Sequence, residues 1–164
     1  SKFNIHGFYF GKKQKKNDYY HLRLKKAFPE YHDVSNKNLD EIVNLSRNLK
    51  IDIAIDLMGY TGGFENRMEI FLKKCAPIQI NFLGYPGTTG GDAIDYLIAD
   101  KYTIPKRFTK FYSEKVLYMP NTYMPFDNTI KVADKKLSRN FKAVFLSDGN
   151  QLFSVEPILF LNNS

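Results

Sequence analysis

The sequence predicts an α/β fold in which short buried strands alternate with helices. Three apolar runs of strand length, at residues 51–57, 78–83 and 94–99, are rich in β-branched and aromatic side chains and are bounded by glycine or proline. Segments with apolar residues at helical spacing occur between such runs and upstream of them. Strands that alternate with helices join through right-handed crossovers, so a Rossmann-like parallel sheet is expected.

The upstream part of the chain supplies further elements of the same kind. Phe3 to Phe10 has apolar residues at alternate positions, and Gly7 interrupts them, which predicts a strand with a glycine bulge. The elements predicted after it are a helix at 19–28 ended by Pro29, a short strand at 31–34, and a helix capped by Ser35 or Asn38 that runs through Leu49.

The downstream part continues the alternation and then becomes less regular. Residues 66–74 carry Met68, Phe71 and Leu72 at helical spacing, between the first two apolar runs. After the third run we expect a short helical turn at 104–110 and a last strand at 115–119. Residues 143–146 and 157–161 are apolar but show no clear periodicity, so no element is assigned there.

Two glycine-rich loops follow the first two strands. In open α/β sheets ligands bind at the carboxyl ends of the strands, so both loops lie where a site would be built. The loop at 59–63 offers backbone N–H groups ahead of a helix start and could bind an anion, or it could be a tight turn. The loop at 84–91 could be a wall with few side chains that a ligand approaches closely, with Thr88 and Thr89 as hydroxyl partners, or a reversing turn.

Acidic and histidine residues give weaker signals. Two pairs of aspartates flank strands, and they favour loop capping and charge balance over metal or acid–base chemistry; they are Asp52, Asp56, Asp95 and Asp100. The three histidines, His6, His21 and His32, have no mutual spacing typical of a metal site or a catalytic triad. We interpret them as surface or core residues, and no metal site is predicted.

Composition bounds the broad class. The chain has 164 residues, 43% of them hydrophobic, which is enough for one core. Its net charge of +7 comes from scattered lysines without the aromatic interleaving of a single-strand binder, so no nucleic-acid partner is expected. Cys75 is the single cysteine, and no apolar run has the length of a membrane span, so a cytoplasmic protein with no membrane partner is expected.

A resemblance to a known family rests on three strings. The chain contains DLMGYTGG, APIQINFLGYPGTTG and YSEKVLYMPNTY, and between about Phe3 and Tyr123 it resembles the catalytic region of the O-GlcNAc transferase and SPINDLY glycosyltransferases. The resemblance implies one lobe of a two-lobe GT-B glycosyltransferase. Residues 1–123 would form the N-terminal Rossmann-like catalytic lobe, incomplete at its N-terminal end, and residues 124–164 a linker and the truncated start of the second lobe.

The resemblance also implies an activity. It is inverting transfer of N-acetylglucosamine from UDP-GlcNAc to Ser or Thr of proteins, with a nucleotide sugar and a protein or peptide acceptor as partners and no metal cofactor. TPR repeats are expected upstream. Alternatives are an O-fucosyltransferase that uses GDP-fucose and a non-catalytic peptide-binding lobe. The family's histidine string and diphosphate lysine do not occur in this sequence, so the catalytic residues are unknown and the isolated chain is expected to be inactive.

The site residues implied by the resemblance lie in the two glycine loops. In the family, the GYT positions line the cleft near the sugar nucleotide, and the Leu-Gly pair of the second loop faces the N-acetylglucosamine. We expect Gly84 to keep the wall open for the sugar, so that Gly84→Val would block activity and leave the fold largely intact. The residues expected to bind the sugar nucleotide are Gly59, Tyr60, Thr61, Leu83, Gly84, Tyr85, Pro86, Gly87 and Thr88.

Overall fold

The computed structural model describes residues 3–11, 18–61, 67–127, 129 and 157–163, the last range by its backbone. In chain order the elements are β1 (Phe3–Tyr9), α1 (Tyr19–Ala27), β2 (Glu30–Asp33), α2 (Leu39–Asn48), β3 (Ile53–Asp56), α3 (Glu69–Leu72), β4 (Ile78–Asn81), β5 (Tyr96–Ala99), the 3-10 helix η2 (Lys106–Phe111), β6 (Lys115–Tyr118) and β7 (Pro157–Asn163).

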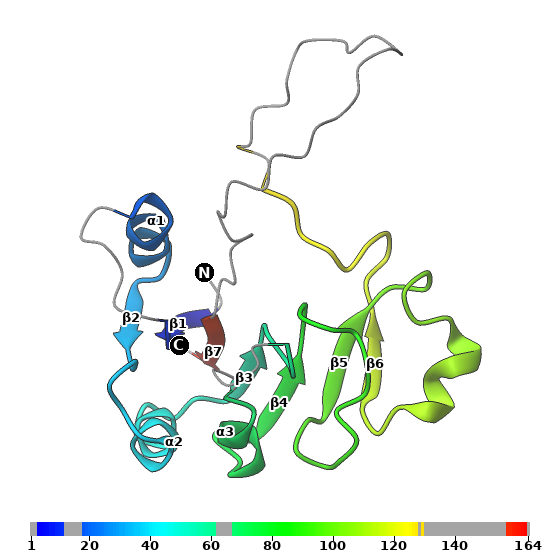
Figure 1. Cartoon of the computed structure of the whole chain (residues 1–164), viewed down its shortest axis with the longest axis horizontal. Coiled ribbons are helices and arrows are strands. Elements are labelled where there is room, and N and C mark those ends of the chain that lie inside the picture. Colours follow the sequence, from blue (N-terminus) through cyan, green and yellow to red (C-terminus); the bar gives the residue numbers. More distant parts are fainter. Residues whose placement is uncertain (1–2, 12–17, 62–66, 128, 130–156, 164) are drawn as a thin grey trace, which may run out of the picture.

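The strands form one sheet in the order β2-β1-β7-β3-β4-β5-β6 (Figure 1). All pairings among β1 to β6 are parallel, as the sequence predicts, whereas β7 runs antiparallel to both β1 and β3. β7 thus separates the β2–β1 edge from the β3–β6 block within the same sheet. The expected boundary near residue 123 stays a prediction, because residues 130–156 lie outside the described residues.

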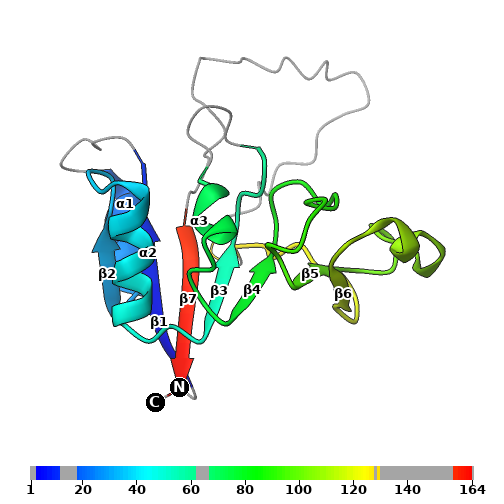
Figure 2. The same cartoon turned by 90° about the horizontal axis from the view of Figure 1, so that it is seen from below.

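Helices cover both faces of the sheet: α1 lies on one face, and α2 and α3 lie on the other (Figures 1 and 2). Asn38 caps α2 by a capping box with Glu41, and the helix buries Ile42 and Val43. α1 begins at the predicted place, where Asp18 accepts a hydrogen bond from the His21 N–H, but it buries none of its residues. No helix in the described ranges has the length and apolar character that crossing a membrane requires.

The main core lies between the sheet and the helices α2 and α3. Its buried residues come from β1, from the end of β2, from these two helices and from the segments that lead into β3, β4 and β5; they include Phe8, Val34, Ile42, Ile51, Ile70, Phe71, Cys75 and Ile94. A second, smaller cluster of Leu97, Ala99 and Ile104 lies under η2. The core therefore supports the block β3–β6 from which the glycine loops emerge.

Two details of the predicted elements are wrong. β1 pairs residue for residue with β2 and β7 across Gly7, so there is no glycine bulge. Gly7 is instead fixed by packing, because a Cβ there would lie 2.9 Å from Cγ of Phe28. The helix expected at 66–74 is confined to Glu69–Leu72 within the described residues, and Lys74 follows it with a φ of 53°.

Candidate functional site

The first glycine loop begins at the carboxyl end of β3 and is held by a local carboxylate. Asp56, 3% exposed, accepts hydrogen bonds from the N–H groups of Met58 at 2.9 Å and Gly59 at 3.0 Å. Burial raises the pKa of Asp56, and these two hydrogen bonds oppose that rise without cancelling it. The hydroxyl of Thr61 donates to the carbonyl oxygen of Met58 at 2.6 Å. Gly62 and Gly63 lie outside the described residues.

The second loop begins after β4 and is held by a carboxylate far away in the sequence. Glu114, 4% exposed, accepts hydrogen bonds from the Thr88 hydroxyl at 2.8 Å, from the Thr89 N–H at 2.6 Å, and from the Thr89 hydroxyl. Burial acts to raise the pKa of Glu114, but these hydrogen bonds outweigh burial, and the pKa is lowered. The carboxylate of Glu114, which directly precedes β6, therefore holds the second loop in place.

The backbone of the second loop is strained where it leaves β4. Leu83 has a φ of 66° and Gly84 a φ of 50°, so two consecutive residues are left-handed. A left-handed leucine costs of the order of 1 kcal/mol and persists only where the surroundings determine it. Pro86 is tied down as well, because its carbonyl oxygen accepts a hydrogen bond from the Tyr112 hydroxyl at 3.0 Å.

The two glycine loops touch each other. A Cβ built on Gly84 would lie 2.2 Å from the carbonyl oxygen of Met58, so the second loop rests directly on the backbone of the first. The Tyr60 hydroxyl also donates to the carbonyl oxygen of Thr89 at 3.3 Å, while the Tyr60 side chain stays 59% exposed. The loops thus form one continuous rim at the carboxyl edge of β3 and β4, which we call the glycine rim (residues 58–61 and 83–91).

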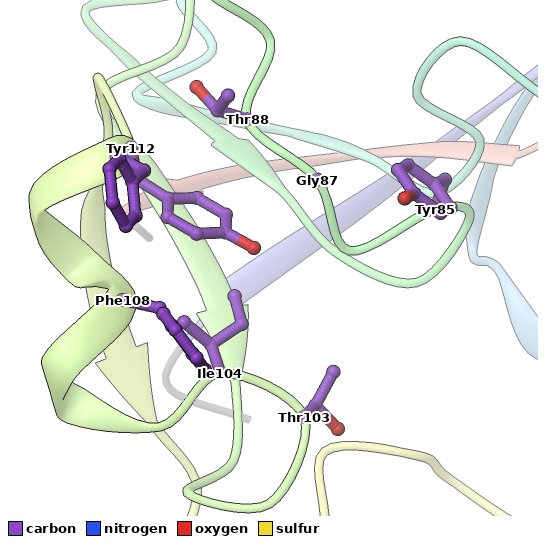
Figure 3. Close-up of a pocket in the computed structure, with 8 residues that line it drawn as sticks. Tyr85, Gly87, Thr88, Thr103, Ile104, Phe108 and Tyr112 are labelled. Carbon is purple, nitrogen blue, oxygen red and sulfur yellow. The ribbon is translucent and has the colours of Figure 1, made fainter.

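A pocket of 420 Å³ opens between the second loop and η2 (Figure 3). In Figure 3, Gly87 and Thr88 lie on the loop, and Ile104 and Phe108 lie on the side nearer η2. Its lining residues are Tyr85, Gly87, Thr88, Thr103, Ile104, Phe108, Phe111 and Tyr112. Three of the nine predicted site residues line this pocket, and the other six lie elsewhere on the glycine rim.

Two of the four aspartates cap loops, which is the role that the sequence favours. Asp100, at the end of β5, accepts hydrogen bonds from the N–H groups of Tyr102 at 2.9 Å, Thr103 at 2.8 Å and Tyr123 at 2.9 Å. Hydrogen bonds from the Thr103 and Tyr123 backbone lower the pKa of Asp100. Asp95 accepts from the Gln79 N–H at 2.8 Å. The capping interpretation is confirmed for Asp56 and Asp100.

Sequence reasoning missed Glu114 and Asn81. Glu114 lies in the YSEK string, but no sequence signal pairs it with a loop 25 residues away. Asn81 is 1% exposed, and its Oδ1 atom has no hydrogen-bond partner within the described part of the chain. A Cβ on Gly59 would lie 3.6 Å from the Asn81 amide, so this side chain lies beneath the first loop. A buried polar residue at the end of a strand is the signal that could have revealed it.

The structure brings two of the three histidines together, which their spacing along the sequence does not predict. The parallel pairing of β1 with β2 brings Nδ1 of His6 to 3.1 Å from Nε2 of His32, although the residues are 26 positions apart. Glu30 lies beside them, and the three side chains offer ligand atoms within 4.8 Å of one another. His21 lies apart from this cluster, packed edge-on against Tyr9 at a ring distance of 5.1 Å.

Comparisons with known proteins agree with this architecture. The family model described as Glycosyl transferase family 41 matches residues 13–157. The chain is 36% identical over 131 residues to the probable UDP-N-acetylglucosamine–peptide N-acetylglucosaminyltransferase SEC of Arabidopsis thaliana, covering 80% of this chain and 13% of that protein. It is 36% identical over 118 residues to the UDP-N-acetylglucosamine–peptide N-acetylglucosaminyltransferase of Caenorhabditis elegans, covering 66% of this chain and 10% of that protein.

A solved structure supports the fold as well as the family. A mutant O-GlcNAc transferase of Thermobaculum terrenum superposes with a TM-score of 0.62 and 30% identity, covering 67% of this chain and 21% of the other. The predicted α/β lobe of GT-B type is thereby confirmed. This sequence spans between a tenth and a quarter of the length of these proteins. The chain belongs to glycosyl transferase family 41.

Proposed function

We propose that the protein containing this chain is a nucleotide-sugar-dependent protein O-glycosyltransferase that moves N-acetylglucosamine from UDP-GlcNAc to Ser or Thr. The acceptor hydroxyl oxygen forms a bond to C1 of the sugar while the bond from C1 to the diphosphate oxygen breaks. The anomeric centre inverts, and the hydroxyl proton passes to a base. Family membership and the printed activities of the Arabidopsis and Caenorhabditis relatives support this reaction.

The observation that carries the proposal is the contact between the two glycine loops at the carboxyl edge of the sheet. Direct packing of Gly84 on Met58 gives a wall made mainly of backbone, which lets a sugar ring approach closely. Tyr60 adds an exposed aromatic ring with a hydroxyl at the edge of that wall. The hydroxyls of Thr88 and Thr89 already donate to Glu114, so we assign these threonines to positioning the loop.

The chain supplies positioning, and other parts of the protein supply the remaining chemistry. We place the base and the cation that stabilises the leaving diphosphate outside these residues. Holding the sugar against a preorganised rim lowers the barrier by orientation and by excluding water. In this proposal the transfer step itself uses no metal ion in the cleft.

The test is a transfer assay on the full-length protein. Purified protein is incubated with a Ser/Thr peptide array and, in separate arms, with UDP-GlcNAc or GDP-fucose. We expect transfer from UDP-GlcNAc and none from GDP-fucose, while the isolated 164-residue chain gives none from either. The matched variant is Tyr60→Phe, which removes a single hydroxyl from the rim.

The outcomes separate the alternatives. Transfer only from GDP-fucose would replace the proposed donor with that of a fucosyltransferase. Peptide binding without transfer from either donor would favour a non-catalytic peptide-binding lobe. Turnover by the isolated chain above a heat-inactivated control would mean that the base lies within these 164 residues.

A further inference from the structure

The sheet edge opposite η2 carries a cluster of three metal-binding side chains. β1 contributes His6, and β2 contributes Glu30 and His32. The register pairs His6 with Glu30 and Phe8 with His32, which places all three side chains on one face of the two strands. Their ligand atoms lie within 4.8 Å of one another. The cluster forms through strand pairing, so spacing along the sequence cannot reveal it.

We propose that His6, Glu30 and His32 bind a zinc ion. Tetrahedral zinc holds its histidine nitrogens at roughly 2.0–2.1 Å, which places two such nitrogens about 3.3 Å apart. The observed separation between Nδ1 of His6 and Nε2 of His32 is 3.1 Å, close to that value. Two histidines and one carboxylate leave the fourth position for water. Nitrogen and carboxylate oxygen ligands together suit zinc better than calcium or magnesium.

The surroundings hold the ligands in place and leave a way in. His6 is 6% exposed, and its ring stacks on that of His32 at 5.4 Å. The buried ring of Phe8 packs edge-on against His32 at 5.1 Å. Glu30 is exposed, so an ion can enter from solvent, and this carboxylate can move the short distance needed to complete the set.

The position of the cluster indicates a structural role. β2 is the edge strand of the sheet, and α1, which connects β1 to β2, buries none of its residues. An ion bound by both strands would join the edge strand to β1 directly. β7 lies between β1 and β3, so the cluster is separated from the glycine rim (Figure 1). The inference therefore stands apart from the proposed transfer reaction.

The test compares zinc binding by full-length protein and three variants after removal of metal with a chelator. Zinc affinity is measured by competition with a chromophoric chelator, and thermal unfolding is recorded with and without zinc. Ligand loss should cost at least as much as loss of an outer-shell partner, so we expect His32→Gln to weaken binding roughly 100-fold or more and Glu30→Gln roughly tenfold. His21→Gln, which changes a histidine outside the cluster, should bind zinc as the unchanged protein does.

Two further readouts keep the test decisive. Cobalt(II) added in place of zinc should give the visible absorption of a tetrahedral site in the unchanged protein and in His21→Gln, and lose it in His32→Gln. Zinc should raise the unfolding temperature of the unchanged protein more than that of Glu30→Gln, whose exposed position leaves the fold intact. Equal zinc affinity in the unchanged protein, Glu30→Gln and His32→Gln would overturn the proposal, and the two histidines would then simply share one hydrogen bond.

Discussion

The two glycine loops lie side by side at one edge of the sheet, yet different interactions hold them. Asp56 fixes the first loop from two and three residues away. Glu114 fixes the second loop from 25 and 26 residues away, through hydroxyl and N–H groups of Thr88 and Thr89. At Asp56 burial has a larger effect than the hydrogen bonds and raises the pKa. At Glu114 the hydrogen bonds have the larger effect and lower the pKa.

This difference shows what each loop depends on. The first loop needs two acceptor oxygens at the end of β3, and Asp56 supplies both from within the same stretch of sequence. The second loop needs an ionised acceptor brought by β6, so its shape depends on the tertiary fold. The two loops contact each other at Gly84 and Met58. Substitutions at these positions should therefore have unequal effects.

The largest effect is expected at Gly84. A valine there would place its Cβ 2.2 Å from a backbone oxygen at a φ of 50°, so the structure contradicts the expectation that the fold tolerates this change. Left-handed strain and overpacking together should destabilise the protein by about 3 kcal/mol or more. Urea unfolding checks this, with Gly91→Val as the control because nothing lies within 4 Å of a Cβ at Gly91. Equal losses in the two variants would contradict the packing of one loop on the other.

The next effect is expected at Glu114. Glu114→Gln turns a carboxylate that accepts from three donors into an amide that must direct its NH₂ group towards some of them. Leaving buried donors unpaired should cost about 2 kcal/mol at pH 7. Glu69→Gln, an exposed change on α3, should stay within about 0.5 kcal/mol. Chemical denaturation that gives the two variants the same stability would show that Glu114 does not hold the loop.

The pH dependence of that effect has a definite sign. The folded pKa of Glu114 lies below its ordinary value of 4.5, so its stabilising contribution is complete above that value and is lost as the pH falls through the folded pKa. The stability difference between the unchanged protein and Glu114→Gln should therefore shrink below about pH 4.5. A difference that stays constant down to pH 3 would contradict the ionised clamp.

A smaller effect on stability is expected at Asp56, and its pH dependence has the opposite sign to that of Glu114. Asp56→Asn removes a buried charge but keeps only one of the two oxygens that accept from the Met58 and Gly59 N–H groups. These two changes oppose each other, so stability at pH 7 should change by less than about 1 kcal/mol. The pKa of Asp56 is raised above 3.8, so its protonated form contributes stability that is lost as the pH rises through the folded pKa. Thermal unfolding between pH 3 and 7 should show that the stability of the unchanged protein rises relative to that of Asp56→Asn as the pH falls. If the relative stability of the unchanged protein fell as the pH fell, the pKa of Asp56 would be lowered in the folded protein and not raised.

The smallest effect on stability is expected at Tyr60. Its hydroxyl makes one long hydrogen bond of 3.3 Å at an exposed position, so Tyr60→Phe should change stability by at most about 0.5 kcal/mol. In the full-length protein it should lower kcat/KM of the proposed transfer reaction about fivefold, the typical effect of one neutral hydrogen bond. Unchanged kinetics with lowered stability would assign the hydroxyl to the fold and remove Tyr60 from the site.

Local sequence patterns predict the helices and strands well, but they predict poorly which of these elements contact each other. The apolar runs at 51–57 and 78–83 contain β3 and β4, and the Asn38 cap starts α2 where its side chain predicts. These features depend on neighbours within a few residues. β4 ends at Asn81, ahead of the predicted end at Leu83, because the backbone of Leu83 and Gly84 is left-handed. The apolar content of this segment does not reveal that backbone conformation.

The contacts that shape the site are long-range. Glu114 meets Thr89 across 25 residues, and His6 meets His32 across 26. Each contact depends on which strands are neighbours and in which register, and a single sequence does not contain that information in any local window. For the same reason the sequence does not predict that β7 lies between β1 and β3. The nine predicted site residues remain a prediction until a ligand is bound.

The most direct test of the central claim is hydrogen–deuterium exchange of the full-length protein with and without saturating UDP-GlcNAc. If the glycine rim faces the donor sugar, amides in residues 58–61 and 83–91 should exchange more slowly with ligand, and those of α1 and β2 should not change. Protection limited to other regions of the protein, with exchange at the glycine rim unaffected, would contradict the assignment of these loops to the donor site.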